Sequence, residues 1–301
     1  MGEESLSLAW FQLKRKVINS IARHKLKGEP PTCNNTIYVF GTGRSGTTWL
    51  QQLLAESVGA ISLFEPLQGV PVSFDSSSEA EENEEFRRIL CRAFDGLPLV
   101  DSSFFSRVQP RNLWEFSGLY VLKEIRVNAC LMSVLEIIQP KYRPAYIFRD
   151  PAWCYLSRRR FPTGMWPTSA SQTRGLVQKL DAISINWSDL FDEQRFAAYW
   201  YFENYQAFRY RHLEKWFLVS YRELREDPHY VVGNLLKGMG IDQRAPIRDK
   251  PWVQQGGWRN KIEPYMDDVR RKIHESLHYI NSLHPSPIEG LDKILARESD
   301  F

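Results

Sequence analysis

The sequence predicts an α/β fold with a central parallel sheet of about five strands and helices on both faces. Two observations lead to this prediction. Short apolar runs, which are typical of buried strands, alternate along the chain with segments of helical period. Polar or charged residues follow these runs, and the carboxyl ends of parallel strands meet at one edge of a sheet. We therefore expect a ligand site at that edge.

The first two predicted strands flank the strongest local signal in the chain. Residues 36–40 (TIYVF) form an apolar run without Gly or Pro, which indicates a buried strand. Thr47 then opens a segment whose leucines recur at helical spacing. Residues 60–64 are predicted to form a second strand that ends at Glu65. The acidic stretch 75–85 is expected to be a solvated loop that runs into a helix.

Three more strands are predicted further along the chain. Residues 120–122 end at Lys123, residues 145–148 end at Arg149, and residues 216–219 lead into Tyr221. Four later segments have helical period, and they cover residues 128–138, 196–210, 230–237 and 265–283. A stretch rich in Pro, Gly, Ser and Trp, residues 161–188, is interpreted as an insertion over the site.

Residues 1–35 are predicted to form an N-terminal amphipathic helix and a linker, and residues 36–301 a single domain. The helix, over residues 6–25, gathers its apolar residues on one stripe. Packing on the domain is favoured over contact with a membrane surface. Residues 27–35 contain two prolines and are typical of a linker.

Composition limits the class of protein. Apolar residues make up 43% of the 301 residues and charged residues 25%, as in soluble globular proteins. A net charge of +3 gives no reason to expect a nucleic-acid partner. The chain has no apolar run long enough for a transmembrane segment, and its four cysteines have no zinc-site spacing. We expect a cytoplasmic enzyme without a metal, although a lumenal domain separated from its membrane anchor would look the same.

The glycine-rich segment 41–48 (GTGRSGTT) is the strongest candidate for a binding site. A strand that turns through glycines into a helix presents backbone N–H groups and the positive end of the helix dipole together, which suits a phosphate or a similar anion. The segment is P-loop-like, but Thr47 stands where a kinase-type P-loop has lysine. It also fits GxGxxG, with Glu65 at 19 residues after Gly46 as a ribose-binding acid. An NAD(P)-dependent oxidoreductase, or a nucleotide-binding module, is therefore an alternative.

The favoured interpretation comes from a resemblance. The pattern GxxRSGTTWL resembles the 5′-phosphosulfate-binding loop of sulfotransferases that use 3′-phosphoadenosine 5′-phosphosulfate (PAPS). The resemblance implies that the loop binds the donor through residues Gly43, Arg44, Ser45, Gly46, Thr47 and Thr48. Arg149, followed eight residues later by Ser157, resembles the 3′-phosphate-binding segment of the same superfamily. A planar guanidinium and a hydroxyl are suitable donors for phosphate oxygens.

Two further segments resemble the same superfamily more loosely. Val219 to Leu224, which contains Tyr221, looks like its segment after the last strand. The second, Gly256 to Lys261, looks like the C-terminal loop that closes over the nucleotide. Together they add to the predicted donor-binding residues Tyr221, Trp258, Arg259 and Lys261.

The chain departs from the superfamily's small-molecule enzymes in its predicted base. The Lys-Thr-His segment that supplies their histidine is absent, and the six histidines are expected away from the strand ends. Carbohydrate and tyrosylprotein sulfotransferases instead carry a glutamate at the position of Glu65 and a strand-end lysine at that of Lys123. A serine that the tyrosylprotein enzymes have before the C-terminal Trp is missing here.

These observations predict a PAPS-dependent sulfotransferase. It would move a sulfuryl group to a hydroxyl or amine of a carbohydrate or small natural-product acceptor, and it would release 3′-phosphoadenosine 5′-phosphate (PAP). The predicted catalytic residues are Glu65 as general base, with Arg44 and Lys123 as stabilisers of negative charge.

Overall fold

Five parallel strands form the centre of the computed structural model, which describes residues 24, 31–67, 84–94, 115–159, 170–247 and 259–299. The order across the sheet is β2-β3-β1-β4-β5. The bounds are β1 Thr36–Phe40, β2 Ile61–Phe64, β3 Tyr120–Glu124, β4 Ala145–Phe148 and β5 Phe217–Ser220. The predicted fold class is therefore confirmed. The central position of β1 puts the loop that follows it in the middle of the carboxyl edge.

Strand β3 continues two residues beyond its predicted end, which changes the setting of Lys123. Val39 of β1 is in register with Lys123 on one side and with Ala145 of β4 on the other. Lys123 is thus part of the sheet and not of the loop after it. The N–H of Glu65 donates to the carbonyl of Lys123 at 2.8 Å and extends the β2–β3 ladder by one residue.

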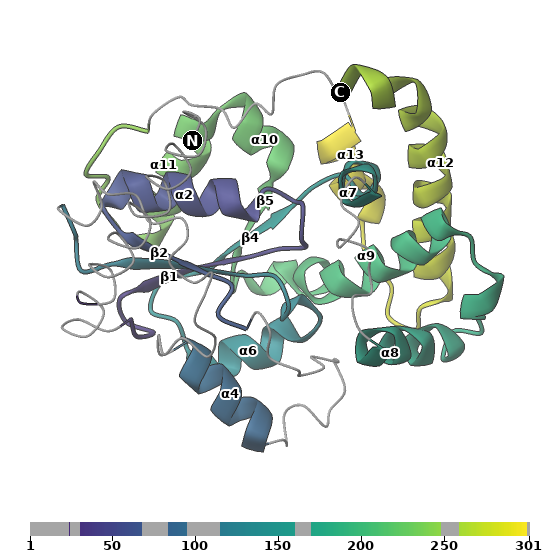
Figure 1. The fold of residues 1–301 in the computed structure, drawn as a ribbon, viewed down its shortest axis with the longest axis horizontal. Helices are drawn as coiled ribbons and strands as arrows, with labels where there is room; N and C mark the ends of the chain where they lie inside the picture. Colours follow the sequence, from purple (N-terminus) through teal and green to yellow (C-terminus); the bar gives the residue numbers. More distant parts are fainter. Residues whose placement is uncertain are drawn as a thin grey trace, which may run out of the picture.

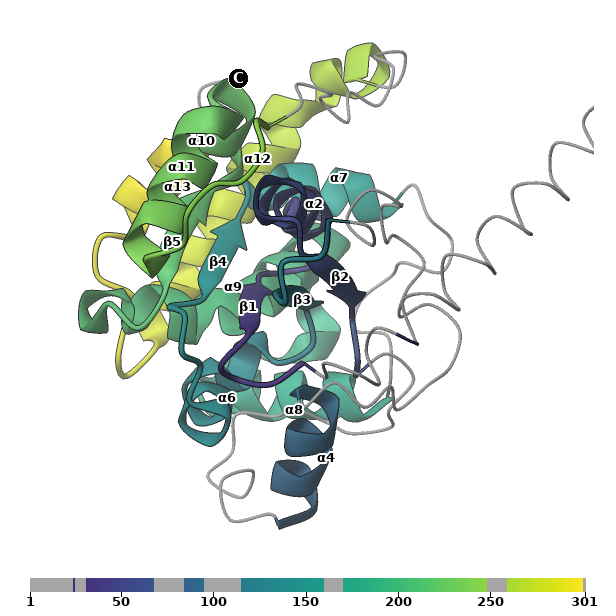
Figure 2. The same ribbon diagram turned by 90° about the vertical axis from the view of Figure 1, so that its left-hand side faces the viewer.

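Helices cover both faces of the sheet (Figures 1 and 2). Alternate side chains of β1 point to opposite faces, so that Ile37 and Val39 join one buried cluster while Tyr38 and Phe40 join another. Helices on the first face are α2 (Thr47–Val58) and α11 (Pro228–Met239). Helix α6 (Leu131–Ile138) covers the second face, where α9 (Asp192–Arg209) also packs.

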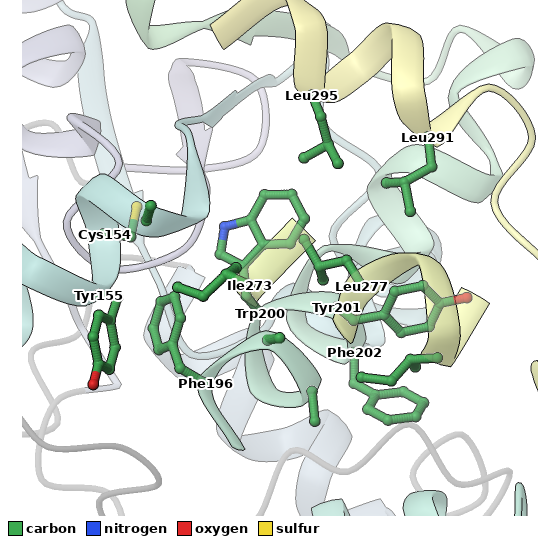
Figure 3. Close-up of a cluster of buried hydrophobic side chains, with 14 of the residues drawn as sticks. Cys154, Tyr155, Phe196, Trp200, Tyr201, Phe202, Ile273, Leu277, Leu291 and Leu295 are labelled. Carbon is green, nitrogen blue, oxygen red and sulfur yellow. The ribbon is translucent and has the colours of Figure 1, made fainter. Parts of the chain in front are cut away.

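A third buried cluster lies beyond β4 and is built mainly from helices (Figure 3). Trp200 of α9 is 1% exposed and lies among Ile273, Leu277, Leu291 and Leu295. The helices that meet there with α9 are α7 (Pro151–Arg159), α8 (Ala170–Asp181), α12 (Arg259–Leu283) and α13 (Leu291–Ser299). Helix α9 thereby joins the sheet to the helical side of the molecule. The remaining elements are α4 (Glu84–Phe94), α10 (Tyr221–Glu226), η1 (Asn128–Cys130), η2 (Trp187–Asp189) and η3 (Arg211–Leu213).

Several helix boundaries differ from the prediction for identifiable reasons. Helix α11 begins two residues earlier, because the Asp227 carboxylate accepts the N–H of Tyr230 at 2.8 Å and Pro228 suits the first helical position. Helix α9 begins at Asp192 and helix α12 at Arg259, so both are longer than predicted. Helices α7, α8, α10 and α13 were not predicted as separate elements.

The stretch 161–188, interpreted as an insertion over the site, contains a regular helix. Helix α8 occupies residues 170–181, and its Leu176 and Leu180 are buried in the third cluster. Residues 161–169 lie outside the described residues, as does the predicted helix 6–25 apart from His24. None of the described helices is both long and apolar enough to cross a membrane.

Helix α13 is fastened to the ends of β4 and β5 by one buried acid. Glu298 is 2% exposed, and it accepts hydrogen bonds from the Ser220 hydroxyl and, at 3.4 Å, from the N–H of Asp150. Burial raises the pKa of Glu298 from its ordinary value of 4.5 to about 7, because desolvation outweighs these hydrogen bonds. The folded protein therefore holds the neutral carboxyl more readily than the unfolded chain does.

Replacement of Glu298 by Gln should make stability less dependent on pH. An acid whose pKa is raised by folding stabilises the protein below its unfolded value, and this contribution is lost as the pH rises through the window between 4.5 and about 7. The free energy of unfolding, measured in urea at the two ends of this window, should fall with pH more steeply in the unmodified protein than in Glu298→Gln. The exposed Glu289, changed to Gln, is the control and should leave the slope unaltered. Equal slopes for the unmodified protein and Glu298→Gln would contradict the expectation.

Candidate active site

The loop after β1 approaches its neighbours so closely that two of its positions require glycine. Gly41 has a φ of +146°, and a Cβ there would lie 2.1 Å from the carbonyl oxygen of Ile147. Gly46 has a φ of +94°, and a Cβ there would lie 2.4 Å from the ring of Tyr221. Backbone with positive φ and no room for a side chain is the situation that selects glycine. The loop is therefore pressed against the ends of β4 and β5.

Hydrogen bonds with buried amide and hydroxyl groups fix the shape of the loop after β1. The Gly41 N–H donates to Oδ1 of Asn128 at 3.2 Å, and the Thr42 hydroxyl donates to Oδ1 of Asn204 at 2.9 Å. Both the N–H and the hydroxyl of Ser45 bond to the carbonyl of Thr42. Ser45, predicted as a donor-binding residue, therefore supports the shape of the loop. Asn128 and Asn204 were missed in the sequence, where single asparagines carry no motif.

The N-terminus of α2 lies at the carboxyl edge. Its N-cap residue is Gly46, which has no side chain to cap the first turn. The N–H groups of Thr47 and Thr48 have no acceptor within the helix at this position, and the dipole adds positive potential. Lys123 Nζ, from the end of β3, donates to the Thr48 hydroxyl at 3.3 Å. Backbone donors, hydroxyls and an ammonium group thus converge where an anion would sit.

Three arginines lie in the same loop or bond to its backbone. Arg44, with a φ of +75°, donates from Nε to the Ser157 hydroxyl at 3.0 Å. Arg149 donates from Nη1 to the carbonyl of Arg44 at 3.4 Å, and Arg158 donates from Nη2 to the carbonyl of Gly43 at 3.3 Å. The predicted residues Arg44, Arg149 and Ser157 are therefore together. Arg158 was missed, although it directly follows Ser157 in a run of three arginines.

Arg149 has the surroundings of an anion-binding residue. Its guanidinium lies over the Tyr221 ring at 4.3 Å and over the Trp153 ring at 5.5 Å. Within the part of the chain that the structure describes, Arg149 pairs with no carboxylate, and its buried Nε has no hydrogen-bond partner. A buried donor without an acceptor is unfavourable, so the stacking holds the guanidinium ready for a ligand that supplies one. Tyr221 contributes as the platform.

The predicted base and lysine form a buried ion pair at the ends of β2 and β3. Oε1 of Glu65 pairs with Lys123 Nζ, and Oε2 accepts from Nη1 of Arg126 at 2.9 Å. Burial alone would raise the pKa of Glu65, but the charges of Lys123 and Arg126 and their hydrogen bonds outweigh it and lower the pKa. Glu65 also has a φ of +42°, a strained conformation of the kind found at functional sites. Arg126 was missed in the sequence, where it ends the segment KEIR.

The sheet order argues against Glu65 as a ribose-binding acid. In dinucleotide-binding sheets the second strand pairs directly with the first, beside the glycine loop. Here β3 separates β2 from β1, so Glu65 follows a strand that is not paired with β1. The oxidoreductase alternative thus loses the residue that supported it.

One histidine lies nearer to a strand end than expected. His274 of α12 has Nε2 3.7 Å from Oδ2 of Asp150, which follows β4. Asp150 is 1% exposed, accepts the N–H of Ala152 at 2.8 Å and pairs with Arg270 at 3.1 Å. His274 therefore belongs to a buried group that supports the end of β4.

The predicted C-terminal loop lies at the limit of what the structure describes. Trp258 falls outside the described residues, as do the side chains of Arg259 and Lys261, which open α12. Their roles stay predictions. Among the described residues, no group of three or more His, Cys, Asp and Glu side chains is arranged to hold a metal ion.

Comparison with known proteins identifies one family. The profile described as "Sulfotransferase domain" matches residues 34–255, about three quarters of the chain. A search of curated proteins finds no match to the chain. The sulfotransferase domain of the Synechococcus olefin synthase is a similar solved structure, with 16% identity, 82% of this chain and 95% of that chain covered, and a TM-score of 0.40. A sulfotransferase of Mycobacterium tuberculosis has 13% identity, coverages of 85% and 82%, and a TM-score of 0.40.

Proposed function

Because the chain belongs to the sulfotransferase domain family, we propose that it transfers a sulfuryl group from PAPS to a hydroxyl or amine of an acceptor. The observation that carries this proposal is that two groups of donors, each suited to an anion, lie on one sheet edge. One is the N-terminus of α2 with Lys123, and the other is the set Arg44, Arg149 and Ser157. A nucleotide with phosphate groups at both its 5′ and 3′ positions needs two such groups.

The residues present fit this donor. We propose that the N–H groups and hydroxyls of Thr47 and Thr48 hold the 5′-phosphate, and that Arg149 and Ser157 hold the 3′-phosphate. The unsatisfied Nε of Arg149 is the observation that favours its part. Arg44 donates to the Ser157 hydroxyl, so we also assign it to the second group, in addition to the charge stabilisation that the sequence predicts for it.

Glu65 and Lys123 are the proposed catalytic residues. In the reaction that the donor supplies, the acceptor oxygen forms a bond to sulfur while the bond from sulfur to the 5′-phosphate oxygen breaks. Glu65 would accept the proton that the acceptor hydroxyl loses. Lys123 contacts both Thr48 and Glu65, and from there it would stabilise the negative charge that develops on the 5′-phosphate.

A carbohydrate hydroxyl is the first acceptor class that we propose, and a small natural-product alcohol or amine the second. The support is the resemblance of the segments at Glu65 and Lys123 to carbohydrate-type members. The proposed compartment, the cytoplasm, rests on the sequence-based expectation alone. Transfer of label from radiolabelled PAPS to a panel of such acceptors tests the function. A thermal shift with NAD(P) but none with PAP would instead favour the oxidoreductase alternative.

Loss of Arg149 should weaken the binding of PAP selectively. Removing a charged hydrogen-bond donor to phosphate costs about 1–3 kcal/mol, so Arg149→Ala should raise the Kd for PAP by one to two orders of magnitude. The Kd for adenosine 5′-phosphosulfate, which lacks the 3′-phosphate, should change much less. Isothermal titration calorimetry measures both constants.

Arg143 offers a matched control for this substitution. Its guanidinium also lies over an aromatic ring, at 4.2 Å from the Phe217 centroid, but it precedes β4 at the other edge of the sheet. Arg143→Ala should leave both constants unchanged. Equal losses for the two nucleotides in Arg149→Ala would mean that Arg149 only maintains the fold of the site.

Replacement of Glu65 by Gln should abolish most of the turnover but not the binding of PAP. The amide keeps the shape of the carboxylate and cannot accept the proton, and a positioned base contributes about 10²–10⁴-fold to a rate. We therefore expect kcat to fall by at least about a hundredfold, measured by steady-state transfer. The exposed Glu289, changed to Gln, serves as the control for a lost carboxylate. Near-normal turnover in Glu65→Gln would exclude Glu65 as the base.

A further inference from the structure

Arg126 lies between two carboxylates at the end of β3. Its Nη1 is 2.9 Å from Oε2 of Glu65 and 3.2 Å from Oε1 of Glu124. The side chains of Glu65 and Glu124 are 9% and 0% exposed, while that of Arg126 is 26% exposed. A single guanidinium nitrogen thus bridges a proposed catalytic residue to a fully buried acid.

Glu124 is a fixed anchor for this bridge. Its Oε2 accepts the N–H of Leu67 at 2.9 Å, and its Oε1 accepts the N–H of Ile125 at 2.8 Å. The carboxylate therefore ties the chain after β2 to the chain after β3. Since Glu124 cannot move without breaking these bonds, Arg126 is held in place from the interior and presents its charge to Glu65.

Glu65 is held through both of its oxygens. Lys123 contacts Oε1 and Arg126 contacts Oε2, so the two cations together fix the rotation of the carboxylate. We propose that Arg126 is a positioning residue for sulfuryl transfer, which turns the Glu65 carboxylate toward Lys123 and keeps it ionised for proton acceptance. This role rests on the proposed function of Glu65 as the base.

The charges around the cluster determine the direction of the effect. Burial opposes ionisation of Glu65, and the pKa of Glu65 is nevertheless low because Lys123 and Arg126 outweigh burial. Burial raises the pKa of Glu124, and the charge of Arg126 opposes this rise. Tyr199 of α9 is close enough to Arg126 to interact with its charge. Glu203 lies one helical turn after Tyr199 and accepts a hydrogen bond from the side-chain amide of Asn128 at 3.2 Å. Loss of Arg126 should therefore raise the pKa of Glu65.

The test is the pH profile of Arg126→Met, in which an unbranched apolar side chain replaces the charge. The acid limb of kcat/KM should move to higher pH, so that the ratio of kcat/KM at pH 5 to that at pH 8 falls about threefold or more. The affinity for PAP should stay unchanged. Arg126→Lys, which keeps a positive charge, should return the acid limb of kcat/KM to nearly its original pH. The control is Arg143→Met. A loss of the same size at every pH would overturn the inference.

A second readout does not depend on turnover. In the full chain labelled with carbon-13 at glutamate carboxyls, the Glu65 signal, assigned by its absence in Glu65→Gln, should titrate at higher pH in Arg126→Met. Arg126→Gln is the second neutral variant, in case the methionine variant does not fold. An unchanged titration would overturn the role of Arg126 even in an active enzyme. If the unmodified protein transfers no sulfuryl group to any acceptor, the proposed function fails, while the titration still tests the contact between Arg126 and Glu65.

Discussion

The buried pair of Glu65 and Lys123 is the interaction on which the arrangement of the site depends. It joins the ends of β2 and β3, and through Thr48 it also touches the first turn of α2. Burying two charges costs several kcal/mol per ion before their attraction is counted, so such a pair is weak evidence for stability. The pair instead determines the geometry of the site. The ammonium group of Lys123 fixes the distance between the Glu65 carboxylate and the N-terminus of α2. The same contacts hold the strained backbone of Glu65.

Helix α9 is the common foundation of the two halves of the molecule. It packs against the sheet through Ala207 and against the helical cluster through Trp200. The same helix provides Asn204, which bonds Thr42 in the glycine loop, and Tyr199, which contacts Arg158 at 3.4 Å. A substitution that alters the packing of α9 would therefore shift the glycine loop, even if the substituted residue touches no ligand.

The sequence was sufficient for the sheet, the glycine loop and most of the residues that the structure gathers around it. These features are local, because strands, glycines and strand-end residues have short-range signals. The partners of the loop are not local: Thr42 and Asn204 are separated by 162 positions. The same holds for Arg126, whose place beside Glu65 depends on the β2–β3 pairing. Lys123 was identified, but its position inside β3 follows from the length of the ladder with β1 and not from its own neighbours.

The three arginines around the loop have a consequence for the molecule as a whole. Arg44, Arg149 and Arg158 carry together as much positive charge as the net charge of the entire chain, +3. These three charges lie at one edge of the sheet, where they add positive potential. A polyanion approaching from solvent would be guided to that edge, and its association rate should fall steeply with ionic strength, since the Debye length is only about 8 Å in physiological salt. Multivalent buffer anions such as sulfate and phosphate would compete for the same place.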